Sequence, residues 1–384
     1  MIQPINKNKK SIKKENQLFT LLVDGNSLLK MSLVDKRMNS KGEEYGAIFV
    51  FLRQLGHLLE KKDFNFCVVC YDGYNSGILR YNYYKDYKAN RDKHYEMAGA
   101  GTTDYDKNIN DYVKKVLNYS RSNKKELKRV ETDDECFQRQ REILQNILEN
   151  LYVRQFMYDD VEGDDLIAYY VKNKLPNENI VIVSGDRDLT QLISDDVCQY
   201  IPSLKKFISP KNSAKELGIT HENTVLKKII CGDSSDNIKG IKGIGEQTLV
   251  KLFPELIENK SDLEAVIARS KELLSERKEQ KKKPLRALEN IINGVTDGSQ
   301  GKDIYEINKK IIDLSEPLLT DEALNALNDE IRAPLSDEGR SIKNIYEIIE
   351  ENGMNYIMDN FGEIFGKFER IIKTEKKYSK NMSR

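Results

Sequence analysis

Three short apolar segments, each with an acidic residue at or next to its end, restrict the fold of this chain more than any other feature. The segments are LFTLLVD (residues 18–24), FNFCVVCYDG (64–73) and NIVIVSGD (179–186). Their length and their β-branched and aromatic content indicate buried strands, and a fourth strand-like stretch lies near residues 151–158. Because the carboxyl ends of parallel strands share one edge of a sheet, we expect the terminal acids to converge there.

Helical patterns separate these segments. Residues 45–60 carry apolar side chains at helical spacing, residues 135–150 show a similar pattern, and a further helix begins at Glu162. The alternation predicts an α/β fold with a central, mostly parallel sheet and helices on both faces. Residues 255–290 and 303–384 have the pattern of charged helices, although we expect the last stretch, 373–384, to be unstructured.

The composition narrows the class of protein. The 62 basic and 62 acidic residues balance, which excludes a simple polycation, but they cluster in separate segments. Five cysteines at uneven spacing favour a reducing, cytoplasmic compartment. Cys67 and Cys70 form a CxxC inside an apolar strand, where packing is the expected role. Three scattered histidines make a histidine-built zinc site improbable. Neither a signal peptide nor a membrane-spanning run is evident, so no membrane partner is expected.

Nine carboxylates stand out by position. They are Asp24, Asp72, Glu162, Asp164, Asp165, Asp186, Asp188, Asp233 and Asp236. Any one of them can be explained as a turn former or a helix cap. Glu162 and Asp165 are three residues apart and share a helix face, while Asp186 and Asp188 point the same way if the chain is extended.

These acids, gathered in one place, would repel one another unless cations neutralise them. Oxygen ligands without nearby histidine or cysteine suit Mg²⁺ or Mn²⁺. Two such ions about 4 Å apart would convert an anionic cluster into a site for a phosphodiester. We therefore predict a two-metal site with Mg²⁺ or Mn²⁺ as cofactor.

Two basic segments accompany the acids. The connection 74–130 is long and includes 80-RYNYYKDYKANRDKHY-95, and the stretch 239-KGIKGIG-245 is a glycine-rich hairpin directly after GDSSDN. Tyrosines in the first segment could stack on single-strand bases, and hairpin glycines let backbone N–H groups approach a phosphate. The nucleic-acid-binding residues predicted from both are Arg80, Tyr83, Tyr84, Lys85, Tyr87, Lys88, Arg91, Lys239, Gly240, Lys242, Gly243 and Gly245.

The motifs VDGN, YDG, VEGDD, SGDRDLTQL and GDSSDNIKGIKGIGEQT occur in this order over roughly residues 20–250. In this the sequence resembles the 5′-nuclease superfamily, which includes flap endonucleases and the 5′-nuclease domains of bacterial DNA polymerases. Within it, the likeness is greatest to the ribonuclease H type of T-even phages. The resemblance implies a PIN-like domain followed by a helix-three-turn-helix module and C-terminal helices.

The expected domain organisation follows from the resemblance. Residues 1–17 form a flexible basic tail, 18–205 the PIN-like domain with an arch at about 74–130, 206–300 the helix-three-turn-helix module and 301–384 the C-terminal helices. The family's metal ligands fall on the nine acids, with one ion near Asp24, Asp72 and Asp164 and the other near Asp186, Asp188 and Asp233. The family's catalytic roles fall on Lys88, Arg91, Asp72, Asp164 and Asp186. The hairpin of this family also holds K⁺.

By the same resemblance, the expected activity is Mg²⁺-dependent 5′-to-3′ exonuclease and flap endonuclease cleavage, including ribonuclease H activity on primers in phage replication. The expected substrates are 5′ flaps, nicked or gapped duplexes and RNA–DNA hybrids. A single-strand-binding protein or sliding clamp is a possible partner, and a monomer is the default. Two alternatives stay open: a non-catalytic, structure-specific DNA-binding protein on the same fold, and a PIN-type ribonuclease.

Overall fold

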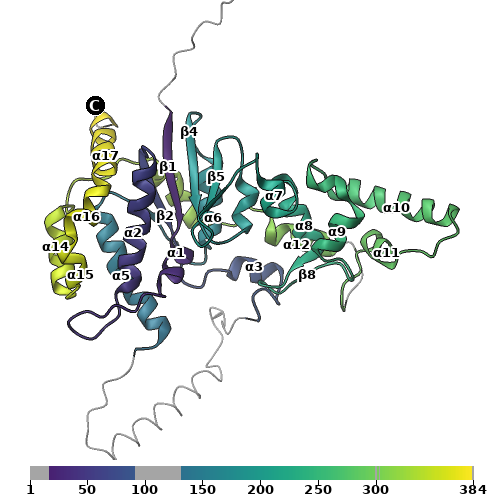
Figure 1. The fold of residues 1–384 in the computed structure, drawn as a ribbon, viewed down its shortest axis with the longest axis horizontal. Coiled ribbons are helices and arrows are strands. Elements are labelled where there is room, and N and C mark those ends of the chain that lie inside the picture. The colour runs from purple at the N-terminus through teal and green to yellow at the C-terminus, as the bar shows by residue number, and fades with distance from the viewer. Residues whose placement is uncertain (1–16, 91–130, 299–300, 302, 383–384) are drawn as a thin grey trace, which may run out of the picture.

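A six-stranded sheet forms the centre of the computed structural model, which describes residues 17–90, 131–298, 301 and 303–382 (Figure 1). Its strands, in sequence order, are β1 (Leu18–Asp24), β2 (Phe66–Cys70), β3 (Arg154–Phe156), β4 (Glu178–Val183), β5 (Val197–Ile201) and β6 (Lys206–Ile208). Their spatial order is β3-β2-β1-β4-β5-β6, and only β6 runs antiparallel to its neighbour. The predicted α/β fold with a mostly parallel sheet is confirmed.

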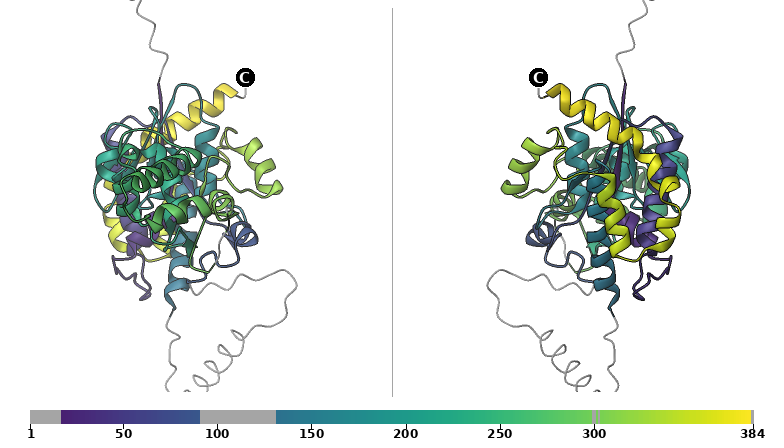
Figure 2. Two further views of the ribbon diagram at one scale, coloured as in Figure 1. Left: turned by 90° about the vertical axis from the view of Figure 1, so that its right-hand side faces the viewer. Right: turned by 90° about the vertical axis from the view of Figure 1, so that its left-hand side faces the viewer.

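Alternating side chains of the strands build two separate cores. Val23 and Val69 face α2 (Gly46–Lys61), α5 (Asp133–Asn150) and the C-terminal helices α14 (Ile342–Glu351), α15 (Asn355–Asp359), α16 (Phe361–Phe365) and α17 (Glu369–Met382). Leu22 and Val68 face α6 (Gly163–Lys172) and α13 (Asp321–Glu330). Figure 2 shows α13 and the helices α14–α16 on opposite sides of the sheet. Both faces are thus buried, which explains why the strands are continuous apolar runs.

The same alternation settles the role of the CxxC motif. Cys67 belongs to the core on one face of the sheet and Cys70 to the core on the other. Both side chains are fully buried and neither is in a disulfide. The prediction that these cysteines serve as packing residues is confirmed.

A smaller helical module lies at the end of the molecule away from α14–α17 (Figure 1). Its elements are α7 (Ser213–Leu217), α8 (Thr224–Cys231), the hairpin strands β7 (Gly232–Asp233) and β8 (Ile238–Lys239), α9 (Glu246–Leu252), α10 (Leu263–Glu279), α11 (Arg286–Asn293) and α12 (Asp303–Ile312). Helices α8 to α12 share an apolar core of their own, which includes Ile230, Ile244 and Phe253. Two helices, α8 and α9, joined by residues 232–245, give the predicted helix–turn–helix arrangement.

Two expectations need correction. Strand β6, Lys206–Ile208, pairs with β5, so the sheet continues past the boundary expected at residue 205. The stretch 373–384 is not unstructured as far as the structure describes it, because α17 runs to Met382. The reason is a buried ion pair in which Glu375 of α17 binds Arg154 of β3, with both N–O distances at 2.7 Å.

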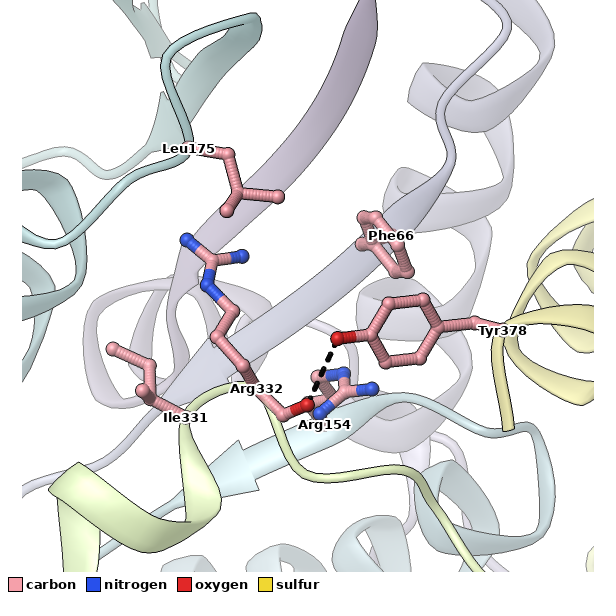
Figure 3. A pocket seen from close by; sticks show the side chains of 6 residues that line it. All are labelled: Phe66, Arg154, Leu175, Ile331, Arg332 and Tyr378. Atoms are coloured by element: carbon pink, nitrogen blue, oxygen red, sulfur yellow. Dashed lines mark hydrogen bonds between the residues drawn. The ribbon is translucent and has the colours of Figure 1, made fainter. Parts of the chain in front are cut away.

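Around that ion pair lies a small pocket that Arg154, Arg332, Phe66 and Tyr378 help to line, where the Tyr378 hydroxyl donates to the Arg332 carbonyl at 2.9 Å (Figure 3). The cavity of about 10 Å³ accommodates about one water molecule, so it is a packing feature and not a ligand site.

A search of the helices that the structure describes finds none with the length and hydropathy of a membrane span.

Candidate metal centre and nucleic-acid interface

Three acids meet where β1, β2 and α6 come together, and we call Asp24, Asp72 and Asp164 the sheet-edge acids. Asp24 ends β1 and accepts hydrogen bonds from Ser27 N at 2.9 Å and Ser184 Oγ at 2.7 Å. Asp72 follows β2 and accepts from Gly163 N at 2.8 Å and Asn26 Nδ2 at 2.7 Å. Asp164 lies in the first turn of α6. The predicted convergence of acids at the strand ends is therefore confirmed for this group.

The electrostatics of the sheet-edge acids show how close they are. Burial, together with the charges of Asp72 and Asp186, raises the pKa of Asp24 to about 7. Burial and the charges of Asp186, Asp24 and Asp72 raise the pKa of Asp164 well above its usual value. Among the described residues, no lysine or arginine forms an ion pair with these carboxylates. Within the part of the chain that the structure describes, this half of the cluster therefore has no paired counter-charge.

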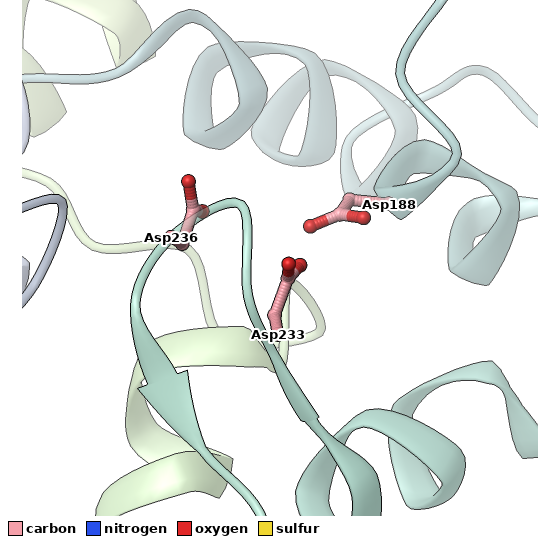
Figure 4. Close-up of side chains that lie close together, drawn as sticks. All are labelled: Asp188, Asp233 and Asp236. Carbon is pink, nitrogen blue, oxygen red and sulfur yellow. The ribbon is translucent and has the colours of Figure 1, made fainter. Parts of the chain in front are cut away.

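A second group lies beside the first, and we call Asp188, Asp233 and Asp236 the hairpin acids (Figure 4). One carboxylate oxygen of each lies within 4.8 Å of the others. Asp188 opens the 3-10 turn Asp188–Leu192, Asp233 ends β7, and Asp236 lies in the turn that follows. The 3-10 helix Asp188–Leu192 (η1) and the loop between α8 and α9 thus bring these acids to one point.

Asp186 links the two groups. Its charge raises the pKa of both Asp164 and Asp188. The expectation that Asp186 and Asp188 project in parallel from an extended segment is wrong, because Asp188 N donates to Asp186 Oδ1 at 2.9 Å and the chain turns into a 3-10 helix. The turn directs Asp188 toward Asp233 and Asp236.

The hairpin acids have a lysine between them. Lys228 of α8 forms ion pairs with Asp188 and Asp233. Burial and Asp186 raise the pKa of Asp188 to about 6 in spite of Lys228. Burial opposes ionisation of Asp233 as well, but the bonds from Lys228 and Ser235 prevail and lower its pKa to about 2. Sequence reasoning missed Lys228, although its position five residues before Asp233 on an amphipathic helix was a usable signal.

Glu162 and Asp165 hold a buried arginine in this structure. Both bind the buried guanidinium of Arg80, at 2.6 Å from Glu162 Oε2 and 2.5 and 3.0 Å from the two Asp165 oxygens. Asp165 is 1% exposed and also accepts Leu318 N at 2.9 Å, so its oxygens are already used. In this structure Asp165 anchors Arg80, and its role as a metal ligand stays a prediction. Burial opposes ionisation of Glu162, but Arg80 and Lys88 prevail and lower its pKa to about 2. Through its ion pair with Lys88, Glu162 orients the neighbouring base of the arch.

Arg80, predicted to bind DNA, is 5% exposed and cannot reach a ligand in this structure. Its Nε also donates to the Ile311 carbonyl at 2.8 Å. The residue therefore joins α3 (Ile78–Tyr83), α6 and α12. Sequence reasoning overlooked that Arg80 could pair with Glu162 and Asp165, the acids at the start of α6.

The base of the arch rests on the acidic cluster. Lys88 forms an ion pair with Glu162, and its backbone N–H donates to the Asp236 carbonyl at 2.9 Å. Lys88 has a left-handed φ of 54°, and Asn90 Nδ2 donates to the Ser234 carbonyl at 3.0 Å. These contacts fix the lysine ammonium at the edge of the site. Arg91, the other predicted catalytic cation, lies outside the described residues, as do the rest of the arch, residues 91–130, and most of the basic tail.

The predicted stacking tyrosines differ in exposure. Tyr83 is 53% exposed and Lys85 is also on the surface, so both can meet a ligand. Tyr84 is half-buried. Tyr87 is 2% exposed, with its hydroxyl 3.0 Å from Glu162 Oε2, so base stacking by this residue is contradicted.

The glycine hairpin has the geometry that its sequence indicates. Gly240 lies against Cys231, where an added Cβ would come within 2.1 Å of the backbone, and Gly243 has a left-handed φ of 81°. Lys239 and Lys242 are exposed beside them, and Gly245 precedes α9. The predicted hairpin residues thus form one exposed surface adjoining the acids.

The residues present fit a pair of divalent cations. The hairpin acids bring their oxygen atoms within 4.8 Å of one another. Burial and the charges of neighbouring carboxylates raise the pKa values of Asp24, Asp164 and Asp188, so the sheet-edge acids and Asp186 also lie near one another. Oxygen-rich, imidazole-free sites of this kind suit Mg²⁺ or Mn²⁺. The fold and the carboxylate cluster together are compatible with a metal-dependent hydrolase, and nucleic-acid binding by the hairpin stays a prediction.

Comparison with known proteins gives the family. The model of the 5′-3′ exonuclease N-terminal resolvase-like domain matches residues 19–228, and the chain belongs to this family, within the 5′-nuclease superfamily. DNA polymerase I of Bacillus subtilis is 26% identical over 267 residues, 68% of this chain and 26% of the polymerase. Thermostable DNA polymerase I of Thermus thermophilus is 27% identical over 238 residues, 61% of this chain and 24% of the polymerase. The chain thus spans about a quarter of the length of these curated relatives.

Solved structures agree on the fold. The bacteriophage T5 5′-exonuclease with bound zinc has a TM-score of 0.52 at 17% identity, covering 91% of this chain and 100% of the phage chain. The bacteriophage T5 flap endonuclease in a complex with DNA and metal ions has a TM-score of 0.51 at 17% identity, covering 91% and 99%.

Proposed function

We propose that the protein is a divalent-metal-dependent phosphodiester hydrolase, acting as a 5′-to-3′ exonuclease and a structure-specific 5′-flap endonuclease. The observation that carries the proposal is the meeting of the sheet-edge acids, Asp186 and the hairpin acids next to an exposed glycine hairpin. Family membership supports the same reaction class.

Two Mg²⁺ or Mn²⁺ ions would be held by these acids. Asp24, Asp72 and Asp164 would hold one, and Asp188, Asp233 and Asp236 the other, with Asp186 between them. The ions supply the positive charge that activates a water and stabilises the departing oxygen of a phosphodiester. Ser184, Asn26 and Gly163 N orient the Asp24 and Asp72 carboxylates by hydrogen bonds, which fixes the ligand oxygens before binding.

Lys88 is the protein's own cation at the reacting phosphate. Glu162 and the ring of Tyr87, 4.8 Å from the lysine Nζ, hold the ammonium at the rim of the acidic cluster. From there it would stabilise negative charge that grows on the phosphate during cleavage. Arg91, three residues further on, is proposed to share this role on the basis of the family resemblance.

The proposed substrates are 5′ flaps, nicked or gapped duplexes and RNA–DNA hybrids. The duplex would lie on the glycine hairpin, with K⁺ as a candidate ion between backbone and phosphate, and Tyr83 and Lys85 would contact the single strand. Such activity would suit removal of RNA primers and flaps in phage replication in the host cytoplasm. We further propose that the protein acts as a monomer, with a single-strand-binding protein or a sliding clamp as its partner.

The test is a cleavage assay on a 5′-flap DNA and on an RNA–DNA hybrid, with and without Mg²⁺, with products mapped to the nucleotide. We expect Mg²⁺-dependent cleavage near the branch by the wild-type protein. Asp72→Ala and Asp186→Ala should lose cleavage but retain DNA binding. Binding without cleavage by the wild-type protein would instead identify a structure-specific binding protein, and cleavage by both variants would refute the metal assignment.

A further inference from the structure

The connection between α10 and α11 carries a concentration of positive charge that the proposed site does not use. Residues 277–286, RKEQKKKPLR, contain six basic residues and one acid, and we call this segment the basic turn. Lys281, Lys282, Lys283 and Arg286 are exposed. Within the described part of the chain, none of these four forms an ion pair.

The first part of α10 is different. There Arg269 is neutralised by Glu272 at 3.0 Å and by Glu276 at 2.9 Å. Basic residues in the last turn of a helix complement its dipole, which accounts for Arg277 and Lys278. Lys281–283 lie beyond the helix, so the dipole does not account for them.

The basic turn has a defined shape. Lys282 N donates to the Arg277 carbonyl at 2.8 Å, and Arg277 Nε donates to the Lys283 carbonyl at 3.0 Å. Lys281 adopts a left-handed φ of 53°. Because the backbone is folded back on α10, the three lysines are presented together and at a low entropic cost for binding.

The basic turn and the glycine hairpin belong to one rigid unit. Lys242 N donates to the Val295 carbonyl, and Asn290 Nδ2 of α11 donates to the Lys242 carbonyl, both at 2.8 Å. Apolar residues of α8, α9, α10 and α11 share one core. Figure 1 shows α10 and α11 extending beyond α8, α9 and β8, on the side away from the sheet.

We propose that the basic turn is a second contact for the phosphate backbone of the duplex that the glycine hairpin holds, an inference that rests on the proposed function. Helix α11, with eight residues and a length of about 12 Å at 1.5 Å per residue, connects the basic turn to Val295, whose carbonyl accepts Lys242 N of the hairpin. A duplex advances about 3.4 Å per base pair, so the basic turn extends the protected duplex by about three to four base pairs.

The experiment measures DNA binding by fluorescence anisotropy in EDTA, so that it does not depend on cleavage. The probes are 5′-flap DNAs with one duplex arm of increasing length. The variant is Lys281→Ala/Lys282→Ala/Lys283→Ala/Arg286→Ala, and its matched control removes four exposed lysines at the other end of the molecule, Lys343, Lys373, Lys377 and Lys380. A thermal melt confirms that both fold.

We expect wild-type affinity to rise with arm length and to level off about three to four base pairs later than that of the variant. Each lost phosphate contact should also lower the slope of log affinity against log salt by about 0.9. The control should match the wild type in both respects. Equal plateau lengths and equal salt slopes for variant and wild type would overturn the inference. Length-dependent binding without any Mg²⁺-dependent cleavage would refute the proposed function and leave the basic turn standing.

Discussion

The sheet-edge acids and the hairpin acids differ in how their charge is balanced. Asp24 and Asp72 are held by neutral donors, namely Ser184, Ser27, Asn26 and Gly163 N. The hairpin acids have a resident cation, Lys228. The sheet thus supplies rigid ligands that need an external cation, and the helical module supplies ligands already partly neutralised. Different responses to mutation, pH and metal are expected from the two halves.

The largest expected effect separates two neighbouring acids. Asp164→Asn should lower single-turnover flap cleavage by roughly 10³-fold, since a metal ligand supports several kcal/mol of charge stabilisation. Asp165→Asn should stay within about tenfold of the wild-type rate, because Asp165 binds Arg80 instead of the reacting groups. Equal losses of rate in the two variants, at equal DNA binding, would contradict the separation of roles.

The next effect concerns stability. Arg80→Ala leaves Glu162 and Asp165 buried without their partner, which should cost about 3–5 kcal/mol in the free energy of unfolding. Lys85→Ala, an exposed change on the same segment, serves as the control and should stay within about 0.5 kcal/mol. Urea denaturation followed by circular dichroism measures the free energy of unfolding of both variants. A loss below about 1 kcal/mol for Arg80→Ala would show that the buried pair does not hold the arch.

A third effect is a link between pH and metal. The folded-state pKa of Asp24 is raised to about 7 from 3.8, so the folded state holds its proton more tightly than the unfolded state. The metal-free protein should therefore lose stability as the pH rises from about 4 through about 7. Mg²⁺ should raise the melting temperature by several degrees at pH 8 and by less at pH 5.5. Asp164→Asn should flatten this dependence, and a metal response independent of pH would contradict the account of the sheet-edge acids.

The smallest effect concerns Lys228. Lys228→Met leaves the hairpin acids without their cation, so the Mg²⁺-induced rise in melting temperature at pH 8 should exceed that of the wild type. Lys227→Met is the matched control, because Lys227 pairs with Glu246 away from the cluster. If Mg²⁺ raises the melting temperature of both variants as much as that of the wild type, Lys228 does not balance the charge of the hairpin acids.

Much of the sheet and part of the site could be predicted from sequence. Asp24 and Asp72 follow strands whose apolar pattern is unmistakable, so their convergence needed only the rule for parallel sheets. Strands β5 and β6 escaped because VCQYI and KFI are short and flanked by polar residues. The burial of Arg80, Tyr87 and Asp165 was not foreseen, because charged and aromatic side chains occur both in exposed binding surfaces and in buried networks. Only the packing of α3 against α6 and α12 decides between them.

The central claim is that two clusters of carboxylates, built on different parts of the fold, form adjoining divalent-cation sites. Anomalous diffraction from crystals soaked in Mn²⁺ tests it most directly. The account predicts two peaks, one among Asp24, Asp72 and Asp164 and one among Asp188, Asp233 and Asp236, with Asp186 between them. A single peak bound elsewhere, or none at saturating Mn²⁺, would contradict it.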